Sequence, residues 1–371
     1  MIRIGITGQY GFVGYHLYQT IKYCTDFQIV NFEKAYFTHE AGLDAFVSKC
    51  NVIIHLAAMN RHMDAQVIYD TNVSLVQKLI EALKRTNSKP HVLMSSSIQE
   101  DRDNLYGKSK KYGRELLESW AKDVGAKFTG LLIPNVFGPF CLPNYNSVVA
   151  TFCHQITRGI HPKIEIDGDL KLIYVDDLVD EILGLVNESS STTKITIAHT
   201  QEVKVSEILN LLQGFEAKYH QNSEIPSFAT KFELDLFNTY RTYFEFKTLY
   251  PKKFKKNTDP RGVFIELIRL NQGGQVSFST TIPGITRGNH FHTKKIERFA
   301  VIKGKALIQL RRIGTDEVYD FELDGNDPSF VDMPVWFTHN IKNIGQEELI
   351  TIFWINEFYN PEDPDTYFEV V

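Results

Sequence analysis

Residues 284–304 read GITRGNHFHTKKIERFAVIKG, and this stretch decides how the C-terminal part of the chain folds. His290 and His292 stand two positions apart, and side chains at that spacing point to the same face of a β-strand. Glu297 follows closely enough that a neighbouring strand can bring its carboxylate to the same point as the two imidazoles. His339, later in the chain, is a fourth candidate ligand. Three imidazoles and one carboxylate suit zinc, and also manganese, iron or nickel. The pattern therefore predicts a divalent metal site.

The spacing within this stretch resembles the first cupin motif. The positions that carry the resemblance are Gly284, His290, His292, Glu297 and Gly304. Pro334, His339 and Asn343 resemble the second cupin motif, which departs here by Trp336 in place of the usual glycine and by a longer gap before Pro334. The resemblance implies an all-β jelly-roll (cupin) domain whose metal is held by the three histidines and Glu297.

Composition limits the classes to which the chain can belong. Its 371 residues suffice for two or three domains, and 43% hydrophobic with 23% charged residues is typical of a globular protein. The net charge is −5 and no basic block occurs, so neither nucleic acid nor an anionic membrane is an expected partner. Scattered cysteines without a C-x-x-C pair, and no apolar run of about 18 residues, predict a soluble cytoplasmic protein.

The pattern of apolar residues changes along the chain. Up to about Glu245, short apolar strands alternate with helical stretches, which indicates βαβ units and a doubly wound parallel sheet. Beyond Phe254, short strands are separated by turn signals such as Pro283-Gly284, which is typical of an all-β barrel or sandwich. We therefore expect an α/β domain at residues 1–245 and an all-β domain at residues 246–371.

A glycine-rich turn follows the first expected strand, residues 2–7, and precedes a helical pattern that runs to Cys24. Glycines there allow a tight turn and a close approach of the backbone to a pyrophosphate, and the helix N-terminus supplies amide donors. The predicted cofactor-binding residues of this turn are Gly8, Gln9, Tyr10, Gly11, Phe12, Val13 and Gly14.

The G-x-x-G-x-x-G spacing resembles the extended short-chain dehydrogenase/reductase family. Motifs similar to those of the family follow in order at residues 52–58, 92–97, 106–110, 133–139 and 174–177. The resemblance covers roughly residues 1–240 and implies a Rossmann-type NAD(P)-binding domain. It also implies further cofactor contacts from Leu56, Ala57, Ala58, Tyr106, Lys110 and Asn135, with Lys110 holding the nicotinamide ribose.

Tyr106 and Lys110 form the Tyr-x-x-x-Lys pair of this family, and they lie on one face of the expected helix. The nearby ammonium is expected to lower the pKa of the tyrosine, which then gives a proton to a ketone oxygen as hydride arrives. A serine hydroxyl donates a second hydrogen bond to that oxygen. The short distance in sequence to Tyr106 leaves the serine open between Ser96 and Ser97, with Ser97 ahead by alignment of the strand.

The choice of nicotinamide cofactor depends on the end of the second strand. Glu33 can bind a ribose 2′-hydroxyl, as NAD requires, whereas Asn31 and Lys34 tolerate a 2′-phosphate. We expect NADPH, by analogy with other enzymes that consume a reduced cofactor.

The start of the all-β region resembles the dTDP-sugar 3,5-epimerase family. Similar motifs occur at residues 259–266, 275–279 and 287–291, and the first of them includes Arg261. In that family arginine and lysine side chains bind the nucleotide phosphates, and the histidine at the His290 position is the base. The chain departs from the family at two positions: it has His292 where the family has glutamine, and Glu297 where the family has a lysine that stabilises the enolate. A divalent metal can restore that charge, and the sequence leaves open whether it is catalytic or structural.

Both halves therefore indicate nucleotide-sugar 4-ketones, and their combination resembles a family of fused reductase–cupin enzymes of capsular polysaccharide synthesis. The resemblance implies a UDP-2-acetamido-2,6-dideoxy-hexos-4-ulose substrate, inversion at C3 in the cupin, and reduction at C4 with NADPH. The product is UDP-N-acetyl-6-deoxy-L-talosamine, on the route to UDP-N-acetyl-L-fucosamine. We also expect a homodimer or a higher homo-oligomer.

Two other interpretations stay open. In one, the reductase works alone and the cupin is a dimerisation module. In the other, the chain is a non-enzymatic NADPH sensor, although such sensors lose the tyrosine that Tyr106 retains here.

Overall fold

The computed structural model of the chain describes all residues except 188–193, 261 and 272. The chain forms two compact units. One is made of residues 1–151 and 166–205, and the other of residues 152–165 and 206–371. Each unit buries its own set of apolar side chains.

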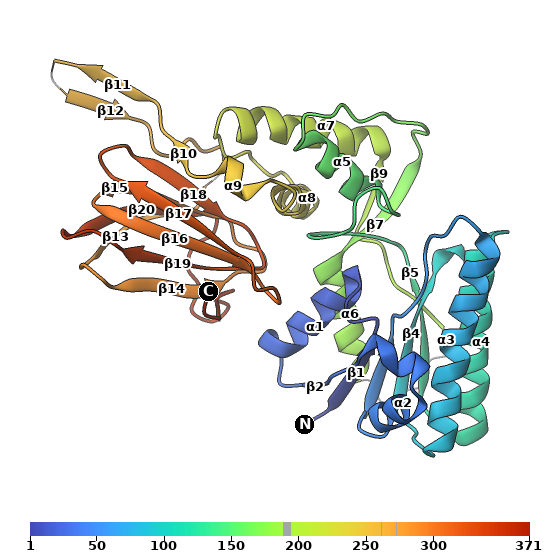
Figure 1. Cartoon of the computed structure of the whole chain (residues 1–371). Coiled ribbons are helices and arrows are strands. Elements are labelled where there is room, and N and C mark those ends of the chain that lie inside the picture. Colours follow the sequence, from blue (N-terminus) through green and yellow to red (C-terminus); the bar gives the residue numbers. More distant parts are fainter. Residues whose placement is uncertain (188–193, 261, 272) are drawn as a thin grey trace. The chain divides into compact units, whose positions relative to one another are not determined.

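A parallel sheet forms the centre of the first unit (Figure 1). In spatial order its strands are β2 (Gln28–Val30), β1 (Arg3–Thr7), β3 (Val52–His55), β4 (His91–Ser97), β5 (Phe128–Ile133) and β8 (Ile195–Thr196). The chain passes from β1 to β2 on one side and then returns to β3 on the other side of β1. The strand order therefore reverses at β1, and ligands of such sheets bind beyond the carboxyl ends of the strands at this point.

Helices cover both faces of this sheet (Figure 1). One face packs on α1 (Phe12–Cys24) and α6 (Val175–Val186), the other on α2 (Glu40–Val47), α3 (Ala65–Arg85) and α4 (Leu105–Val124). Apolar residues of α3 recur at helical spacing, and those that enter the core are Val76, Leu79, Ile80 and Leu83. The doubly wound α/β arrangement expected from the sequence is confirmed.

Smaller elements complete the first unit. β7 pairs in parallel with β6 and antiparallel with β9, apart from the main sheet. The bounds of these strands and of the short helices are β6 (Asn135–Phe137), β7 (Asp169–Tyr174), β9 (Gln201–Lys204), η1 (Lys34–Thr38) and η2 (Ile98–Asp101). The helix α5 (Val148–Ile156) belongs to the first unit up to Thr151 and to the second unit from Phe152.

The second unit is dominated by antiparallel sheets, as expected for the C-terminal region. One sheet has the order β10 (Lys252–Lys253), β18 (Ser329–Met333), β15 (Glu297–Lys303), β20 (Leu349–Ile355) and β13 (Gln275–Thr281). Another has the order β17 (Val318–Asp324), β16 (Lys305–Arg312), β19 (Phe337–Asn343), β14 (Thr286–Phe291) and β21 (Tyr367–Phe368).

The two sheets face each other across a shared interior. Phe299 of β15 contacts the ring of His339 of β19, with ring centroids 6.0 Å apart. Glu297 and Phe299 stand two positions apart on β15, so both side chains point to the same face. The interior side of β15 therefore brings a carboxylate and an aromatic ring against the opposite sheet.

A helical segment comprises α7 (Val205–Phe215), the π-helix η3 (Glu216–Gln221), α8 (Lys231–Arg241) and α9 (Phe246–Leu249). Its parts η3 and α8 contact the outer side of β18, whereas Phe246 of α9 packs on Tyr319 and Phe337 of the other sheet. Tyr219 of η3 donates to Asp332 of β18 at 2.7 Å, and Arg241 of α8 donates to the carbonyl of Met333 at 2.9 Å. A separate hairpin, β11 (Lys256–Asp259) and β12 (Gly262–Ile265), precedes β13.

Candidate functional site

The glycine-rich turn lies directly after β1, where the strand order reverses. Gly8 has φ +82°, and Gly11 donates its backbone N–H to the Gly8 carbonyl at 2.9 Å. A Cβ on Gly14 would lie 2.2 Å from that same carbonyl oxygen, so a larger residue would break the turn. The N-terminus of α1 follows at Phe12, and it presents the backbone amides that can hold a phosphate.

The loop after β3 lies against this turn. Leu56 donates its N–H to the Thr7 carbonyl at 3.0 Å, and a Cβ on Gly8 would lie 2.8 Å from the Ala57 nitrogen. Ala58 follows in the same loop. The structure therefore brings the predicted contacts of residues 8–14 and 56–58 to one edge of the sheet.

The other predicted cofactor contacts are more dispersed. Gln9 is buried and donates to the carbonyl of Phe32, whereas Tyr10 is 77% exposed. Asn31 lies directly after β2, and Lys34 is exposed at the start of η1. The Asn135 amide donates to the Lys171 carbonyl on β7 at 3.3 Å, which turns it toward the small sheet.

Tyr106 and Lys110 lie on the first turns of α4, which Asn104 caps by accepting from the Gly107 N–H at 2.7 Å. The Ser97 hydroxyl, at the end of β4, is hydrogen-bonded to the phenol of Tyr106. Lys110 is buried and donates to the Ser95 hydroxyl at 3.4 Å. The structure therefore brings Ser97, Tyr106 and Lys110 together.

Ser96 has different partners. Its hydroxyl donates to the carboxylate of Glu100, which also accepts from Arg114 Nε at 2.9 and 3.2 Å. Neighbouring residues of a strand face opposite sides, so Ser96 is directed away from the side that Ser97 shares with Tyr106. The geometry favours Ser97 over Ser96 as the partner of the tyrosine.

Burial dominates the acid–base properties of this group. It lowers the pKa of Lys110 to about 8, and the carboxylate of Glu100 opposes that shift. Burial also raises the pKa of Tyr106 above its usual value, partly offset by the Ser97 hydrogen bond. The expectation that the tyrosine pKa is lowered is therefore wrong, because desolvation of the phenolate outweighs any attraction to the ammonium. Tyr106 is a phenol at neutral pH, which suits a proton donor.

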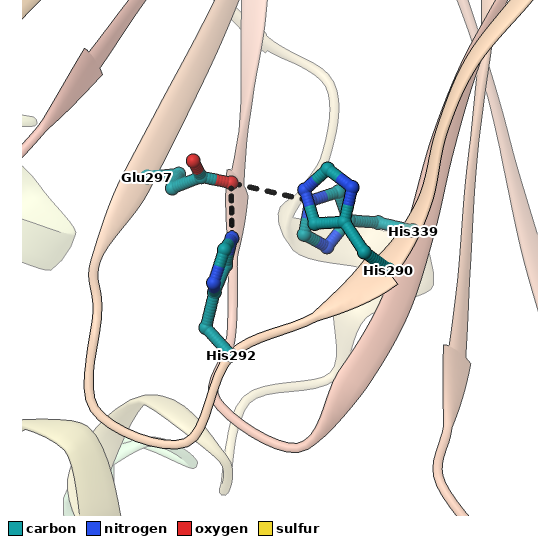
Figure 2. A group of neighbouring side chains, drawn as sticks. All are labelled: His290, His292, Glu297 and His339. Carbon is teal, nitrogen blue, oxygen red and sulfur yellow. Dashed lines mark ion pairs between the residues drawn. The ribbon is translucent and has the colours of Figure 1, made fainter. Parts of the chain in front are cut away.

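The predicted metal ligands form a tight cluster in the second unit. His290 of β14 pairs in register with His339 of β19, His292 follows β14, and Glu297 opens β15 on the opposite sheet. One potential ligand atom from each of the four lies within 4.8 Å of all the others (Figure 2). Glu297 Oε2 is 3.1 Å from Nε2 of both His292 and His339.

The chemistry of this cluster fits a divalent cation. Glu297 Oε2, His292 Nε2 and His339 Nε2 are buried and have no hydrogen-bond partner among the described residues. Buried polar atoms left in that state are costly unless an ion coordinates them. The donor set of three imidazoles and one carboxylate suits zinc or another transition metal.

Two members of the cluster, Glu297 and His290, are in the protonation state that a metal needs. Burial favours the neutral acid of Glu297, but the imidazoles of His292 and His339 outweigh it and hold the pKa of the carboxyl well below its usual range. Burial, followed by the charges of His339 and His292, lowers the pKa of His290 to about 3. Glu297 is therefore a carboxylate and His290 a neutral imidazole at neutral pH. For His292, burial favours the neutral imidazole, but the Glu297 carboxylate outweighs it and raises the pKa.

The structure describes only part of the epimerase-like motifs. Arg261 lies outside the described residues. Arg287 donates to the Thr281 hydroxyl and the Thr280 carbonyl, both at 3.0 Å. Two buried groups escaped the sequence analysis: Glu100 with Arg114, and Asp365 beside His292. No local motif marks any of them, and only the tertiary structure brings them to the sites.

Comparisons with known proteins agree with both halves of this description. The family model of the NAD dependent epimerase/dehydratase family matches residues 4–198, and that of the polysaccharide biosynthesis C-terminal domain matches residues 257–367. The chain belongs to the NAD dependent epimerase/dehydratase family. Within it, the chain is 32% identical over 370 residues to the UDP-2-acetamido-2,6-beta-L-arabino-hexul-4-ose reductase of Pseudomonas aeruginosa, covering 99% of this chain and 98% of that protein.

Solved structures of the family extend the likeness. The capsular polysaccharide assembling protein CapF from Staphylococcus aureus is similar over 100% of both chains, with 36% identity and a TM-score of 0.63. The resemblance to a fused reductase family of capsule synthesis is therefore confirmed. RMD from Pseudomonas aeruginosa, complexed with NADPH, has 21% identity and a TM-score of 0.54 over 58% of this chain and 83% of its own, which supports the fold. No helix in the described residues is long and apolar enough to cross a membrane.

Proposed function

We propose that the chain is a two-site nucleotide-sugar enzyme of capsular polysaccharide synthesis. Its N-terminal part reduces the C4 ketone of a UDP-2-acetamido-2,6-dideoxy-hexos-4-ulose with NADPH, and its C-terminal part inverts C3 of the same sugar. The observation that carries this proposal is the full-length similarity to a UDP-sugar 4-ketone reductase, joined to a Ser97–Tyr106–Lys110 group. The product is UDP-N-acetyl-6-deoxy-L-talosamine.

The reduction follows from the arrangement around Tyr106. NADPH, when bound along the glycine turn with Asn31 and Lys34 near its 2′-phosphate, supplies the hydride for C4. The phenol of Tyr106 gives its proton to the C4 oxygen, and Ser97 donates a second hydrogen bond to that atom. Lys110 is protonated at neutral pH, and its positive charge stabilises the phenolate that remains.

The C-terminal sheets support a jelly-roll cupin whose centre is the four-residue cluster. His290, His292, Glu297 and His339 would hold Zn²⁺ or another divalent ion, which supplies positive charge as a Lewis acid. An imidazole nitrogen cannot hold a metal and accept a proton at the same moment. His290 is therefore either the C3 base or a ligand, and in the second case another group removes the C3 proton.

The order of the two reactions follows from carbonyl chemistry. The C3 proton is acidic only while a ketone stands at C4, because the carbanion must delocalise into that carbonyl. Once hydride has reached C4, C3 can no longer be inverted by this route. Epimerisation therefore precedes reduction, and reduction draws the epimerisation equilibrium forward.

Heavy-water labelling tests both activities. The Tyr106→Phe protein, incubated with the 4-keto sugar and NADPH, should oxidise no NADPH yet should place deuterium at C3. The His290→Ala protein should lose the labelling whether that residue is a base or a ligand. Equal labelling with and without His290, or none with the Tyr106→Phe protein, contradicts the epimerase. The alternative is then a reductase whose C-terminal module serves association.

Two structural proposals accompany this function. We place the functional boundary after residue 245, so that residues 246–371 form the cupin. The chain would assemble as a homodimer or a higher homo-oligomer, and light scattering of the purified protein tests that assembly.

A further inference from the structure

The C-terminal segment, residues 363–371, runs beside the strand that leads to the histidine cluster. Its short strand β21 pairs antiparallel with β14, with His290 opposite Phe368 and Phe291 opposite Tyr367. Glu369 donates its N–H to the Asn289 carbonyl at 3.0 Å. The end of the chain is thus joined to the strand that carries His290.

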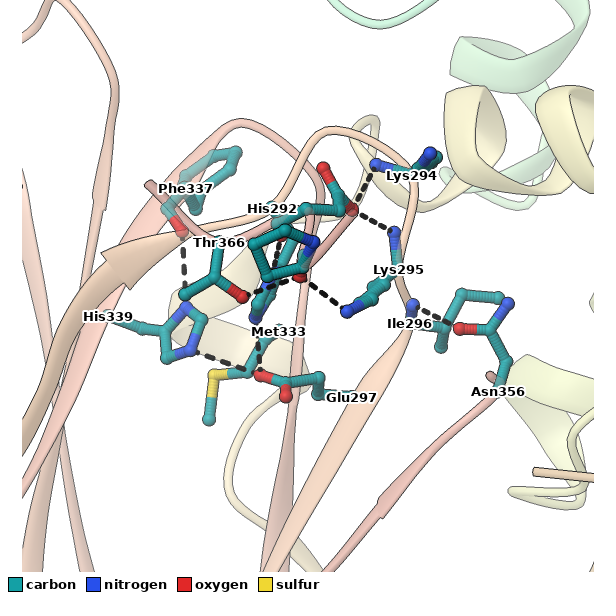
Figure 3. Close-up of polar contacts among 12 residues, drawn as sticks. His292, Lys294, Lys295, Ile296, Glu297, Met333, Phe337, His339, Asn356 and Thr366 are labelled. Atoms are coloured by element: carbon teal, nitrogen blue, oxygen red, sulfur yellow. Dashed lines mark hydrogen bonds and ion pairs between the residues drawn. The ribbon is translucent and has the colours of Figure 1, made fainter. Parts of the chain in front are cut away.

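Asp365 is the most constrained side chain of this segment. It is 2% exposed, and its Oδ1 accepts from the Thr293 N–H at 3.0 Å and from the Thr293 hydroxyl at 2.8 Å. Its Oδ2 accepts from the backbone N–H groups of Lys294 and Lys295, both at 3.1 Å. The carboxylate therefore fixes the turn that joins His292 to Glu297. Figure 3 shows this turn, with Lys294, Lys295 and Ile296 between the two residues.

The backbone of Asp365 contacts the cluster itself. Its carbonyl is hydrogen-bonded to Nδ1 of His292. Since a carbonyl only accepts, Nδ1 carries the hydrogen, and Nε2 is left as the atom that faces Glu297 at 3.1 Å. Asp365 adopts φ +38°, a conformation that L-residues avoid unless the surroundings impose it.

We propose that Asp365 is a positioning residue of the metal site: it selects the tautomer of His292 and holds the 292–297 turn in the coordinating geometry. Partners of this kind, which hold the outer nitrogen of a histidine ligand, raise metal affinity without touching the metal. This inference rests on the metal binding proposed above. It extends the site from the four ligands to a residue 73 positions away from His292.

Zinc affinity of the full chain tests the role of Asp365. Asp365→Asn keeps the shape of the side chain, but it removes the charge and turns an amide group toward donors that need an acceptor. We expect zinc alone, titrated in competition with a chromogenic chelator, to bind about 10–100-fold more weakly. Asp363→Asn is the matched control, because the Asp363 carboxylate pairs with the exposed Lys294 ammonium at 2.9 Å. The zinc affinity of this variant should equal that of the wild type.

A double variant distinguishes positioning from general damage to the fold. Because Asp365 holds both His292 and the turn that leads to Glu297, adding Asp365→Asn to His292→Ala should lower zinc affinity less than Asp365→Asn does in the wild type. An equal fold-change in zinc affinity in both backgrounds overturns the proposal. If Asp365→Asn does not fold, Thr293→Val provides a milder change, because it deletes only the hydroxyl donor to the carboxylate. This variant should weaken zinc binding severalfold. If the folded variants bind zinc as tightly as the wild type, the proposal about Asp365 is also overturned.

The wild-type titration separates this inference from the one on which it depends. If the wild-type protein binds no zinc, the proposed metal site fails and this inference fails with it. If the wild type binds zinc and Asp365→Asn binds it equally well, only the role of Asp365 fails.

Discussion

Glu297 and Arg298 are consecutive residues of β15, and they serve opposite sides of the strand. Glu297 faces the histidine cluster inside the sheets, whereas Arg298 donates from Nε and Nη2 to the two carboxylate oxygens of Asp332, at 2.7 and 2.9 Å. Both members of this ion pair are buried, and Arg298 also donates to the carbonyl of Ser223 at 2.9 Å. The outer face of the strand is thus joined to the helical segment.

Loss of the guanidinium should destabilise the second unit. Arg298→Met leaves the Asp332 carboxylate buried without its cation, which costs about 3–5 kcal/mol of unfolding free energy. Chemical denaturation of the full chain measures this loss. Arg298→Met/Asp332→Leu should recover much of it, because the uncompensated charge is then removed as well.

A matched arginine provides the control for that experiment. Arg269 also pairs with a carboxylate, that of Glu266, at 2.6 Å, but both side chains are exposed. Arg269→Met should leave the denaturation midpoint unchanged, since solvent screens an exposed ion pair. A similar loss for Arg298→Met and Arg269→Met would mean that burial of the Asp332 pair is unimportant.

The two adjacent serines of β4 should differ in what their removal changes. Ser97→Ala deletes the hydroxyl bonded to Tyr106 and should lower kcat for NADPH oxidation about 100-fold or more, because a donor to the C4 oxygen is lost. Ser96→Ala deletes the donor to Glu100 and should lower stability by about 1 kcal/mol while most of kcat is retained. Steady-state kinetics and thermal melting of both variants compare them, and a larger loss of kcat for Ser96→Ala would reverse the assignment.

Short-range patterns made much of this molecule predictable from sequence. The strand, glycine turn and helix at residues 2–24 form one local unit, and the structure has them at Arg3–Thr7 and Phe12–Cys24. The spacing of His290, His292 and Glu297 was equally informative, because strand geometry turns such spacing into convergence. His339 was a fourth candidate that the resemblance to the second cupin motif supported, and it lies in register with His290.

Long-range contacts and burial were not predictable in the same way. Asp365 lies beside His292 in a C-terminal segment that pairs with β14, and the intervening sequence carries no signal for this contact. The lowered pKa expected for Tyr106 failed for a related reason. The distance to Lys110 can be read from helical spacing, but the desolvation that decides the sign depends on the packing around α4.

Lys110 provides a test of that desolvation through the pH dependence of stability. Its pKa is about 8 in the folded protein, against an ordinary value of 10.5, and burial is the main cause. Between these two values the unfolded chain holds a proton that the folded protein has already released. Raising the pH through this window therefore stabilises the fold as far as Lys110 is concerned.

Substitution by methionine isolates this contribution, because the other titrating groups are common to both proteins. At about pH 7 the wild type carries a buried ammonium that Lys110→Met lacks, whereas at about pH 10 the folded wild type has a neutral amine. The stability of Lys110→Met relative to the wild type should therefore fall by about 2–3 kcal/mol over this range. Urea denaturation of both proteins at a series of pH values measures the difference. A difference that is constant with pH would mean that Lys110 keeps an ordinary pKa, and hence that its ammonium is hydrated rather than held in the dry environment beside Ser95.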